Sequence, residues 1–406
     1  MKILRADFIL KCDESFEIIK DGAISFDKKI LAVDSFENIK KLYKDEEIEY
    51  LGEGSVIMPG LINTHLHLEF SSNRISLDYG DFMTWLKSVI EKRDELLNRC
   101  EKDNCIKKAL DTILESGTTT IGAISSFGDD LKECKDTPLN VVYFTEILGS
   151  DPASVDMLFS NFLERLDRAK ECEDESFIPA ISIHSPYSTH PILAKKVLEI
   201  AKDEGMLVST HLLESYAERE WLDRGEGGFL EFLKAFNPHA KPMIRALEYI
   251  ELFRDNKTLF THLCYAKKEE IDAIFMMGGS ITHCPRSNRL LGSRRLEIEN
   301  LNEFNIATDG LSSNNSLSLW DEMRAFLMLH ESLDINLLAK MALSSVTIDA
   351  AKALALKKGS LKEGYDSDFI VLNLHESIDD ISKIALMLLL FTKEASQVFI
   401  DGKRLK

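Results

Sequence analysis

The chain has 406 residues, 45% of them hydrophobic and 29% charged, with a formal net charge of −19. This length exceeds one ordinary domain and fits a large α/β barrel with a smaller domain beside it. The acidic charge argues against a nucleic-acid partner, because binding phosphates requires a basic surface. Charged residues interrupt the apolar N-terminus, and the apolar run 384–391 is too short to span a bilayer. We therefore expect a cytoplasmic protein with no membrane partner.

Short strands alternate with polar turns at both ends of the chain. They are predicted at residues 2–10, 17–19, 23–26 and 29–33, and again at 369–373 and 397–400. Short strands need partners, so the two ends are expected to pair with each other. We predict one small β-sandwich domain made of residues 1–55 and 357–406.

Between these ends, apolar strands alternate with helical stretches. Eight strands are predicted, at residues 56–63, 118–125, 140–148, 180–184, 207–211, 258–262, 280–283 and 306–308. Eight parallel strands with crossover helices close into a barrel. Residues 56–356 are therefore predicted to form a (β/α)8 barrel of the α/β class.

Local helix signals agree with this pattern. A helix over residues 82–99 has one apolar face and Asp81 as its N-cap. Ser215 and Glu218 form a capping-box pattern that opens the helix after the fifth strand. Gly278 and Gly279 end the helix that follows the sixth strand.

Cysteine is scattered along the chain. The seven cysteines are odd in number and are never spaced as CxxC. In a cytosolic chain of this size such cysteines are expected to be reduced packing residues.

The distribution of histidine carries the functional argument. Six of the ten histidines follow predicted barrel strands, namely His65, His67, His184, His211, His262 and His283. Asp309 follows the eighth strand in the same way. One such histidine is more often structural, but six at the carboxyl rim of a barrel indicate a site, because barrel enzymes carry their chemistry there. The other four, His190, His239, His330 and His375, are expected to be structural or surface residues.

His65 and His67 lie two residues apart at the end of the first barrel strand. Strand side chains alternate, so both imidazoles face the barrel interior and can bind one cation together. Three neutral imidazoles and one carboxylate suit Zn²⁺ or Fe²⁺ and leave one position for water.

Five motifs follow the predicted strands, namely Pro59-Gly60-Leu61-Ile62-Asn63-Thr64-His65-Leu66-His67, His211-Leu212-Leu213-Glu214, Thr261-His262, Thr282-His283-Cys284-Pro285-Arg286-Ser287-Asn288 and Thr308-Asp309-Gly310-Leu311-Ser312-Ser313-Asn314. Together they resemble the amidohydrolase superfamily, in the branch of adenosine-type, guanine and cytosine deaminases and chlorohydrolases. The resemblance implies one divalent metal ion, zinc in preference to iron, on His65, His67, His211 and Asp309. Binuclear members carry a carboxylated lysine after the fourth strand, where this chain has His184 and no lysine.

The resemblance also implies catalytic roles for three residues. Asp309 would accept a proton from the attacking water, and His262 would orient that water. Glu214 would carry a proton to the ring nitrogen beside the attacked carbon. The alternative for Glu214 is a carboxylate that merely stabilises the start of a helix.

Arginines cluster after the seventh strand, with four in ten residues from Arg286 to Arg295. A guanidinium at this rim could hold a substrate carboxylate bidentately. We expect this role for Arg286, whereas Arg289, Arg294 and Arg295 could equally lie in a solvated loop. The residues expected to bind substrate are Glu69, Trp85, Glu146, His184, Arg286 and Ser287.

Within its branch, the chain is similar to the aminodeoxyfutalosine deaminases of menaquinone biosynthesis, whose substrate joins adenine, ribose and a benzoate. The expected partner is thus a small-molecule nucleoside. The alternatives are a deaminase of S-adenosylhomocysteine or methylthioadenosine, then a guanine deaminase or chlorohydrolase, and last a non-catalytic scaffold. The sequence leaves the oligomeric state open, a homo-oligomer included.

Overall fold

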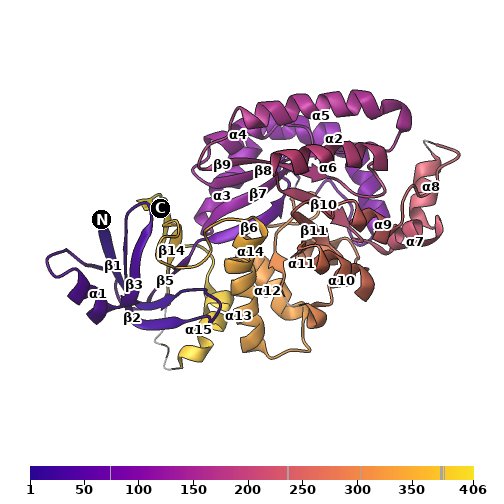
Figure 1. Cartoon of the computed structure of the whole chain (residues 1–406). Helices are drawn as coiled ribbons and strands as arrows, with labels where there is room; N and C mark the ends of the chain where they lie inside the picture. Colours follow the sequence, from indigo (N-terminus) through magenta and orange to yellow (C-terminus); the bar gives the residue numbers. More distant parts are fainter. Residues whose placement is uncertain (74, 236, 302, 375–377, 379) are drawn as a thin grey trace.

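The computed structural model describes residues 1–406 except 74, 236, 302, 375–377 and 379, and it contains two sheets (Figure 1). The terminal sheet has the strand order β16-β15-β14-β5-β1-β2-β3, with β4 paired to β1. Its strands are β1 (Lys2–Leu10), β2 (Ile18–Phe26), β3 (Ile30–Ser35), β4 (Glu49–Tyr50), β5 (Ser55–Pro59), β14 (Phe369–Asn373), β15 (Gln397–Ile400) and β16 (Lys403–Arg404). Both ends of the chain therefore meet in one mixed sheet, as predicted. The division at residues 55/56 and 356/357 stays a prediction.

The second sheet is a nearly closed barrel of eight parallel strands in the order β13-β12-β11-β10-β9-β8-β7-β6. They are β6 (Leu61–Leu66), β7 (Thr118–Ser125), β8 (Asn140–Ile147), β9 (Phe177–Ile183), β10 (Val208–Leu212), β11 (Thr258–His262), β12 (Ser280–His283) and β13 (Asn305–Ile306). Every one of these strands was predicted within a few residues of its position. The predicted barrel with a smaller β domain is confirmed.

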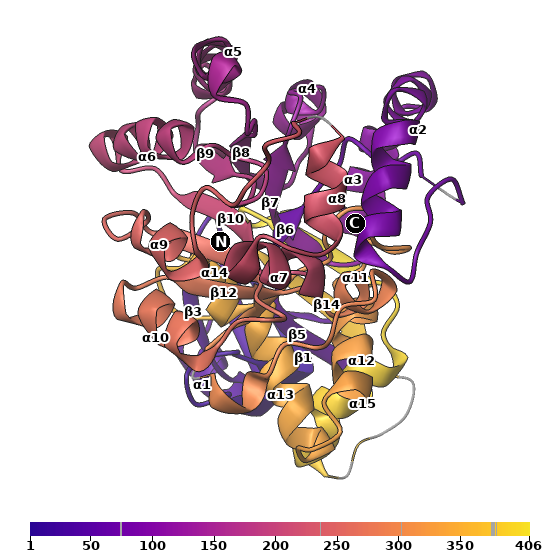
Figure 2. The same ribbon diagram turned by 90° about the vertical axis from the view of Figure 1, so that its right-hand side faces the viewer.

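Helices lie around the barrel strands, as the view in Figure 2 shows. The longer ones are α2 (Phe82–Asp103), α3 (Cys105–Glu115), α5 (Val155–Lys170), α6 (Pro191–Glu204), α7 (Tyr216–Arg224), α10 (Lys268–Met276), α12 (Leu319–Leu329), α13 (Ile335–Ser345) and α15 (Ile384–Phe391). The shorter ones are α1 (Phe36–Leu42), α4 (Leu131–Asp136), α8 (Gly228–Lys234), α9 (Ala246–Glu251), α11 (Pro285–Leu290) and α14 (Ile348–Ala353), with 3-10 turns at Pro152–Ser154, Ile298–Asn300 and Ile381–Lys383. Within the described ranges, no helix combines the length and apolarity needed to cross a membrane.

The predicted strand 56–63 is wrong in one respect, because the structure divides it at Gly60 into β5 and β6. The chain leaves the terminal sheet there and enters the barrel. A Cβ on Gly60 would lie 2.2 Å from the hydroxyl oxygen of Thr119, so only glycine allows this close passage. Two predicted strands, 17–19 and 23–26, are conversely joined in the single strand β2.

The helix starts follow the predicted caps with one difference. The Asp81 carboxylate accepts from the backbone N–H of Thr84, and the Ser215 hydroxyl accepts from that of Glu218. The Glu218 carboxylate, however, accepts from the N–H of Glu214 instead of closing the box on Ser215. Glu218, in the first turn of α7, thereby also holds the backbone of Glu214.

The expectation that all cysteines are reduced is wrong. Cys100 and Cys105 form a disulfide across the turn between α2 and α3, with their Cα atoms 4.9 Å apart. Asn104 adopts a left-handed conformation (φ 50°) that ends α2 and starts α3, and this sharp turn brings the two thiols together. Spacing alone could not show this reversal, since side chains five residues apart on one continuous helix would point in different directions.

A buried ion pair joins the terminal sheet to the barrel. The Lys358 ammonium lies 2.5 Å from the carboxylate of Asp368 and 3.1 Å from that of Asp366. Asp368 also accepts from the side-chain amide of Asn140 on β8 and from the backbone N–H of Asp401. These contacts connect the two sheets through one carboxylate that is 3% exposed.

We expect Lys358→Met to destabilise the fold by about 3–5 kcal/mol, because it leaves a buried carboxylate without its cation. Thermal unfolding of the purified variant measures the loss. Lys362→Met is the matched control, since the Lys362–Glu14 pair lies at the surface and its loss should not shift the midpoint measurably. Equal shifts in the two variants would contradict the linking role of the buried pair.

Candidate metal centre and active site

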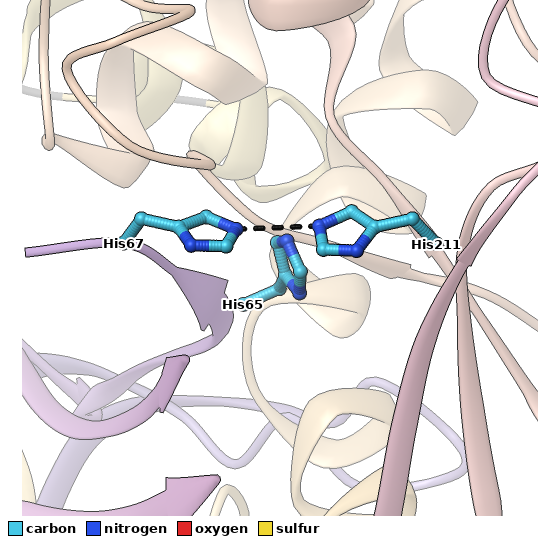
Figure 3. Close-up of side chains that lie close together, drawn as sticks. All are labelled: His65, His67 and His211. Carbon is cyan, nitrogen blue, oxygen red and sulfur yellow. Dashed lines mark hydrogen bonds between the residues drawn. The ribbon is translucent and has the colours of Figure 1, made fainter. Parts of the chain in front are cut away.

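Three imidazoles converge at the carboxyl rim of the barrel (Figure 3). His65 and His67 come from the end of β6 and His211 from β10. The Nε2 atoms of His67 and His211 are 3.2 Å apart, and one ring nitrogen from each of the three residues lies within 4.8 Å of the others. The buried Nε2 of His65 has no hydrogen-bond partner among the described residues. This arrangement brings nitrogen lone pairs together around one point.

Burial favours the neutral form of two of these rings, His65 and His211. It lowers the pKa of His65 and of His211 well below the ordinary value, and the neighbouring histidines lower it further. His211 Nδ1 lies 2.9 Å from the carbonyl oxygen of His184 and must donate to it. The proton of His211 is therefore on Nδ1, and its Nε2 is free to bind a cation.

Asp309 completes the cluster from the loop after β13. One carboxylate oxygen lies 3.8 Å from His65 Nε2 and 3.7 Å from His67 Nε2. The other accepts from the hydroxyls of Ser287 and Ser313, each at 2.8 Å. Burial alone would raise the pKa of Asp309, but the imidazoles of His67 and His262 beside it and the Ser287 hydrogen bond hold it below its ordinary value. Asp309 is thus an ionised carboxylate facing the imidazoles.

Glu214 and His262 lie beside the same cluster. Glu214 Oε1 lies 3.6 Å from His262 Nε2, and ligand atoms of both residues lie within 4.8 Å of Asp309. Burial raises the pKa of Glu214 well above its ordinary value, and the charges of Asp309 and Glu218 raise it further. The two carboxyl groups thus have opposite tendencies: Asp309 releases its proton and Glu214 keeps one.

Three of the predicted substrate residues lie near this cluster. The ring centroid of His184 lies 5.0 Å from that of His211. A carboxylate oxygen of Glu146 lies within 4.8 Å of a ring nitrogen of each of these two histidines. Glu146 also accepts from the Ser126 hydroxyl at 2.5 Å. The Ser287 hydroxyl donates to the carboxylate of Asp309, so the position of Ser287 favours a role in orienting that carboxylate. Substrate contact by these residues stays a prediction.

Trp85 donates its indole N–H to the carbonyl of Ser312 at 2.8 Å. This bond joins the start of α2 to the loop that follows Asp309. The indole therefore lies beside a segment that carries a site residue, and its role in substrate binding stays a prediction.

Glu69 has a different environment from the other predicted substrate residues. Its carboxylate accepts from the backbone N–H groups of residues 126, 127, 128 and 129. It also lines a cavity of about 360 Å³ with Cys100 and Cys105, and none of the described metal-cluster residues lines that cavity. The structure thus gives Glu69 the task of holding the loop after β7.

The arginine segment is divided among several partners. The Arg286 guanidinium contacts the side-chain oxygens of Asn314 and Asn315 and lies 3.6 Å from Glu322. Arg294 donates to the carbonyl of Cys264, and Arg289 is exposed. Arg286 therefore already has protein partners at the rim, and its predicted role toward a substrate carboxylate stays a prediction.

Arg295 points away from the cluster. It pairs with Glu299 at 2.6 Å and reaches His330, which is fully buried and contacts His283. His330 was expected to be structural or a surface residue and is the former, while His375 lies outside the described residues. Sequence reasoning singled out neither Asn288 nor His330 as a contact of the site. Asn288 belongs to the same motif as His283, and this proximity in the sequence was the signal that could have pointed to Asn288.

The donor set fits a divalent cation. Three neutral imidazoles and an ionised carboxylate are the ligands of single-ion zinc sites, and they suit Fe²⁺ as well. The partnerless Nε2 of His65 is a buried polar atom that a cation would satisfy. No lysine accompanies His184 after β9 to bridge a second ion.

The comparisons with known proteins agree with this geometry. Residues 56–405 match the amidohydrolase family, and the chain belongs to that family. The chain is 44% identical over 388 residues to the aminodeoxyfutalosine deaminase of Nitratiruptor, covering 95% of both chains. It is 37% identical to the adenosine deaminase of Helicobacter pylori over 99% of both. The crystal structure of the Helicobacter pylori aminofutalosine deaminase in complex with methylthio-coformycin superposes with a TM-score of 0.93, at 35% identity and 100% coverage of both chains.

We expect Glu69→Ala to lower the stability of the fold, because four backbone N–H groups lose their acceptor. The expected loss is about 1–3 kcal/mol, measured by thermal unfolding. Glu133→Ala is the control, since Glu133 lines the same cavity and its carboxylate accepts no backbone N–H among the described residues. If Glu69→Ala instead raised only KM and left the unfolding midpoint unchanged, Glu69 would be a substrate residue.

Proposed function

We propose that this chain is a metal-dependent deaminase that hydrolyses the amino group from the adenine ring of 6-aminodeoxyfutalosine, in menaquinone biosynthesis. The observation that supports the reaction is the placement of Glu214. Its buried carboxyl group favours the protonated form and lies 3.6 Å from His262, beside the imidazole cluster. The 44% identity to an aminodeoxyfutalosine deaminase supports the substrate.

The proposed metal ligands are His65, His67, His211 and Asp309. The donor set favours a single zinc ion, with Fe²⁺ as the alternative. A divalent ion held there would supply Lewis-acid activation of the attacking water. The second oxygen of Asp309 is held by Ser287 and Ser313, so the carboxylate keeps one orientation toward the cluster.

The reaction replaces the amino nitrogen on the adenine ring carbon with the oxygen of water. Asp309 is ionised and accepts a proton from the water while the water oxygen attacks that carbon. Glu214, whose burial favours the protonated form, gives its proton to the adjacent ring nitrogen, which makes the carbon more electrophilic. The bond from the carbon to the amino nitrogen then breaks as this nitrogen takes the proton that Asp309 accepted. The new hydroxyl group on the carbon returns its proton to Glu214, and ammonia leaves.

A second candidate function has its own support. A relative of 37% identity is named an adenosine deaminase, and the related structure contains methylthio-coformycin. Both observations favour an adenine nucleoside without a carboxylate, such as adenosine or methylthioadenosine. Arg286 decides between the two, because a guanidinium at the rim matters mainly for an anionic substrate.

We expect the purified protein to hold about one divalent ion per chain. His67→Ala and Asp309→Ala should lose that ion together with activity, because each removes a ligand. Glu214→Gln should keep the ion and lower kcat by about 10²–10⁴-fold, because it removes only a proton donor. Elemental analysis and ammonia release measure the two effects. His239→Ala, at an exposed position, is the control, and loss of the ion from Glu214→Gln would contradict the assigned roles.

We expect faster ammonia release, as kcat/KM, from 6-aminodeoxyfutalosine than from adenosine, methylthioadenosine or S-adenosylhomocysteine. Arg286→Ala should raise KM for the carboxylate-bearing nucleoside by about tenfold or more, as for the loss of a charged hydrogen bond. It should leave KM for adenosine nearly unchanged. Equal values of kcat/KM on the four substrates would reject the substrate assignment, and an equal loss on adenosine would remove the role of Arg286.

A further inference from the structure

A chain of hydrogen-bonding side chains leads from His262, beside the metal cluster, toward the protein surface. Its members, which we name the buried relay, are His262, Asn288, His283, His330 and Arg295. The side-chain amide of Asn288 lies 2.8 Å from His262 Nδ1 and 3.3 Å from His283 Nδ1. The Nε2 atoms of His283 and His330 are 3.3 Å apart, and His330 Nδ1 lies 3.1 Å from Arg295 Nη1. The three histidines are fully buried.

The surface end of the buried relay can only donate. A guanidinium has five N–H groups and no acceptor, and Glu299 at 2.6 Å keeps Arg295 charged. His330 Nδ1 must therefore accept from Arg295. Burial lowers the pKa of His330 to about 4, so this ring is neutral at neutral pH and has its single proton on Nε2.

The direction of every other bond follows from this end. His330 donates from Nε2, so His283 accepts at Nε2. Burial also lowers the pKa of His283 well below its ordinary value, so its one proton is on Nδ1. The oxygen of the Asn288 amide must accept that proton. The amide nitrogen is then left to donate to His262 Nδ1, which puts the proton of His262 on Nε2.

In the structure, the amide oxygen of Asn288 lies toward His262, which is the reverse of the orientation required by these bond directions. Exchanging oxygen and nitrogen leaves the heavy-atom positions almost unchanged, so the orientation is decided by the partners. With the oxygen toward His262, every bond reverses and His330 Nδ1–H faces an N–H of Arg295 at 3.1 Å. Two donors facing each other at this distance lose a charge-assisted bond inside the protein.

We propose that Arg295 fixes the direction of the buried relay and thereby makes His262 present an N–H, at Nε2, on the side of Glu214 and the metal cluster. This nitrogen is the atom 3.6 Å from Glu214 Oε1. It has no hydrogen-bond partner among the residues that the structure describes.

The tautomer decides what His262 can do, and this consequence rests on the proposed function. An Nε2–H donates a hydrogen bond to the attacking oxygen and cannot take a proton from it. Proton acceptance is then left to Asp309. A protonated Nε2 also cannot bind a cation, which agrees with a single ion on the other three imidazoles. Arg295 acts on the reaction only through the relay, as a positioning residue.

The tautomer of His262 is measured directly by NMR on the zinc-loaded protein labelled with ¹⁵N-histidine. The His262 signals are assigned from their absence in His262→Asn. We expect a one-bond proton on Nε2 and an unprotonated Nδ1. A proton on Nδ1 in the wild-type protein would overturn the proposal.

Variants of Arg295 test the origin of that tautomer. Arg295→Met removes the obligate donor and should move the ratio of the two His262 tautomers toward Nδ1–H by about tenfold or more, as for the loss of a charged hydrogen bond. It should lower kcat and leave KM unchanged. Arg295→Lys retains a donor and should restore both the tautomer and kcat. Arg289→Met, an exposed arginine of the same segment, is the control for the tautomer. An unchanged ratio in Arg295→Met would overturn the role of Arg295.

If Arg295→Met fails to fold, the His262 tautomer in Asn288→Asp provides a second test of the relay. A carboxylate accepts from both neighbours, so His262 must place its proton on Nδ1 whatever Arg295 does. An Nε2–H that persists in Asn288→Asp would contradict the relay. The NMR readout does not depend on turnover. A protein that shows the expected tautomers but deaminates none of the adenine nucleosides would refute the proposed function and leave the relay standing.

Discussion

One backbone hydrogen bond has an effect on both the fold and the site. The N–H of Asp309 donates to the carbonyl of His65 at 3.1 Å, and so joins the loop after the last barrel strand to the end of the first. The same bond places the Asp309 carboxylate less than 4 Å from the imidazole of His65. Asp309 has a positive φ of 60° there, a conformation that costs energy for a side chain with a Cβ. Barrel closure and the assembly of the cluster are therefore one event, and the strain at Asp309 is offset by contacts of the closed barrel.

Burial gives the two carboxyl groups of the site different roles. Glu214 is buried and lies near the carboxylates of Asp309 and Glu218, so its neutral form is favoured and its pKa rises. Asp309 is equally buried but faces imidazoles and accepts two hydroxyl bonds, so its ionised form is favoured. Environments that push two pKa values apart separate an acid from a base in one cavity. This separation requires that neither residue be reached freely by bulk water.

The arginines after β12 show how an acidic protein uses its few clustered cations. Arg286 lies against Glu322, Arg295 against Glu299, and Arg294 on a carbonyl of the rim. Their first effect is to satisfy acceptors of the protein itself. Arg295 has a second effect, because a group that can only donate sets the direction of every hydrogen bond connected to it. A surface ion pair in this way influences a ring fully enclosed in the barrel.

The sequence by itself determined the barrel, the β domain from both termini, and the set of polar residues at the carboxyl rim. It could do so because strand alternation, helix caps and the position of His65, His67, His211, His262 and Asp309 after strands are local properties of the chain. The tertiary structure decided the break at Gly60, the disulfide between Cys100 and Cys105, the task of Glu69, and the partners of Arg286 and Arg295. Each of these depends on which atoms of distant segments come within bonding distance. That distance is set by packing, and the order of residues along the chain does not contain it.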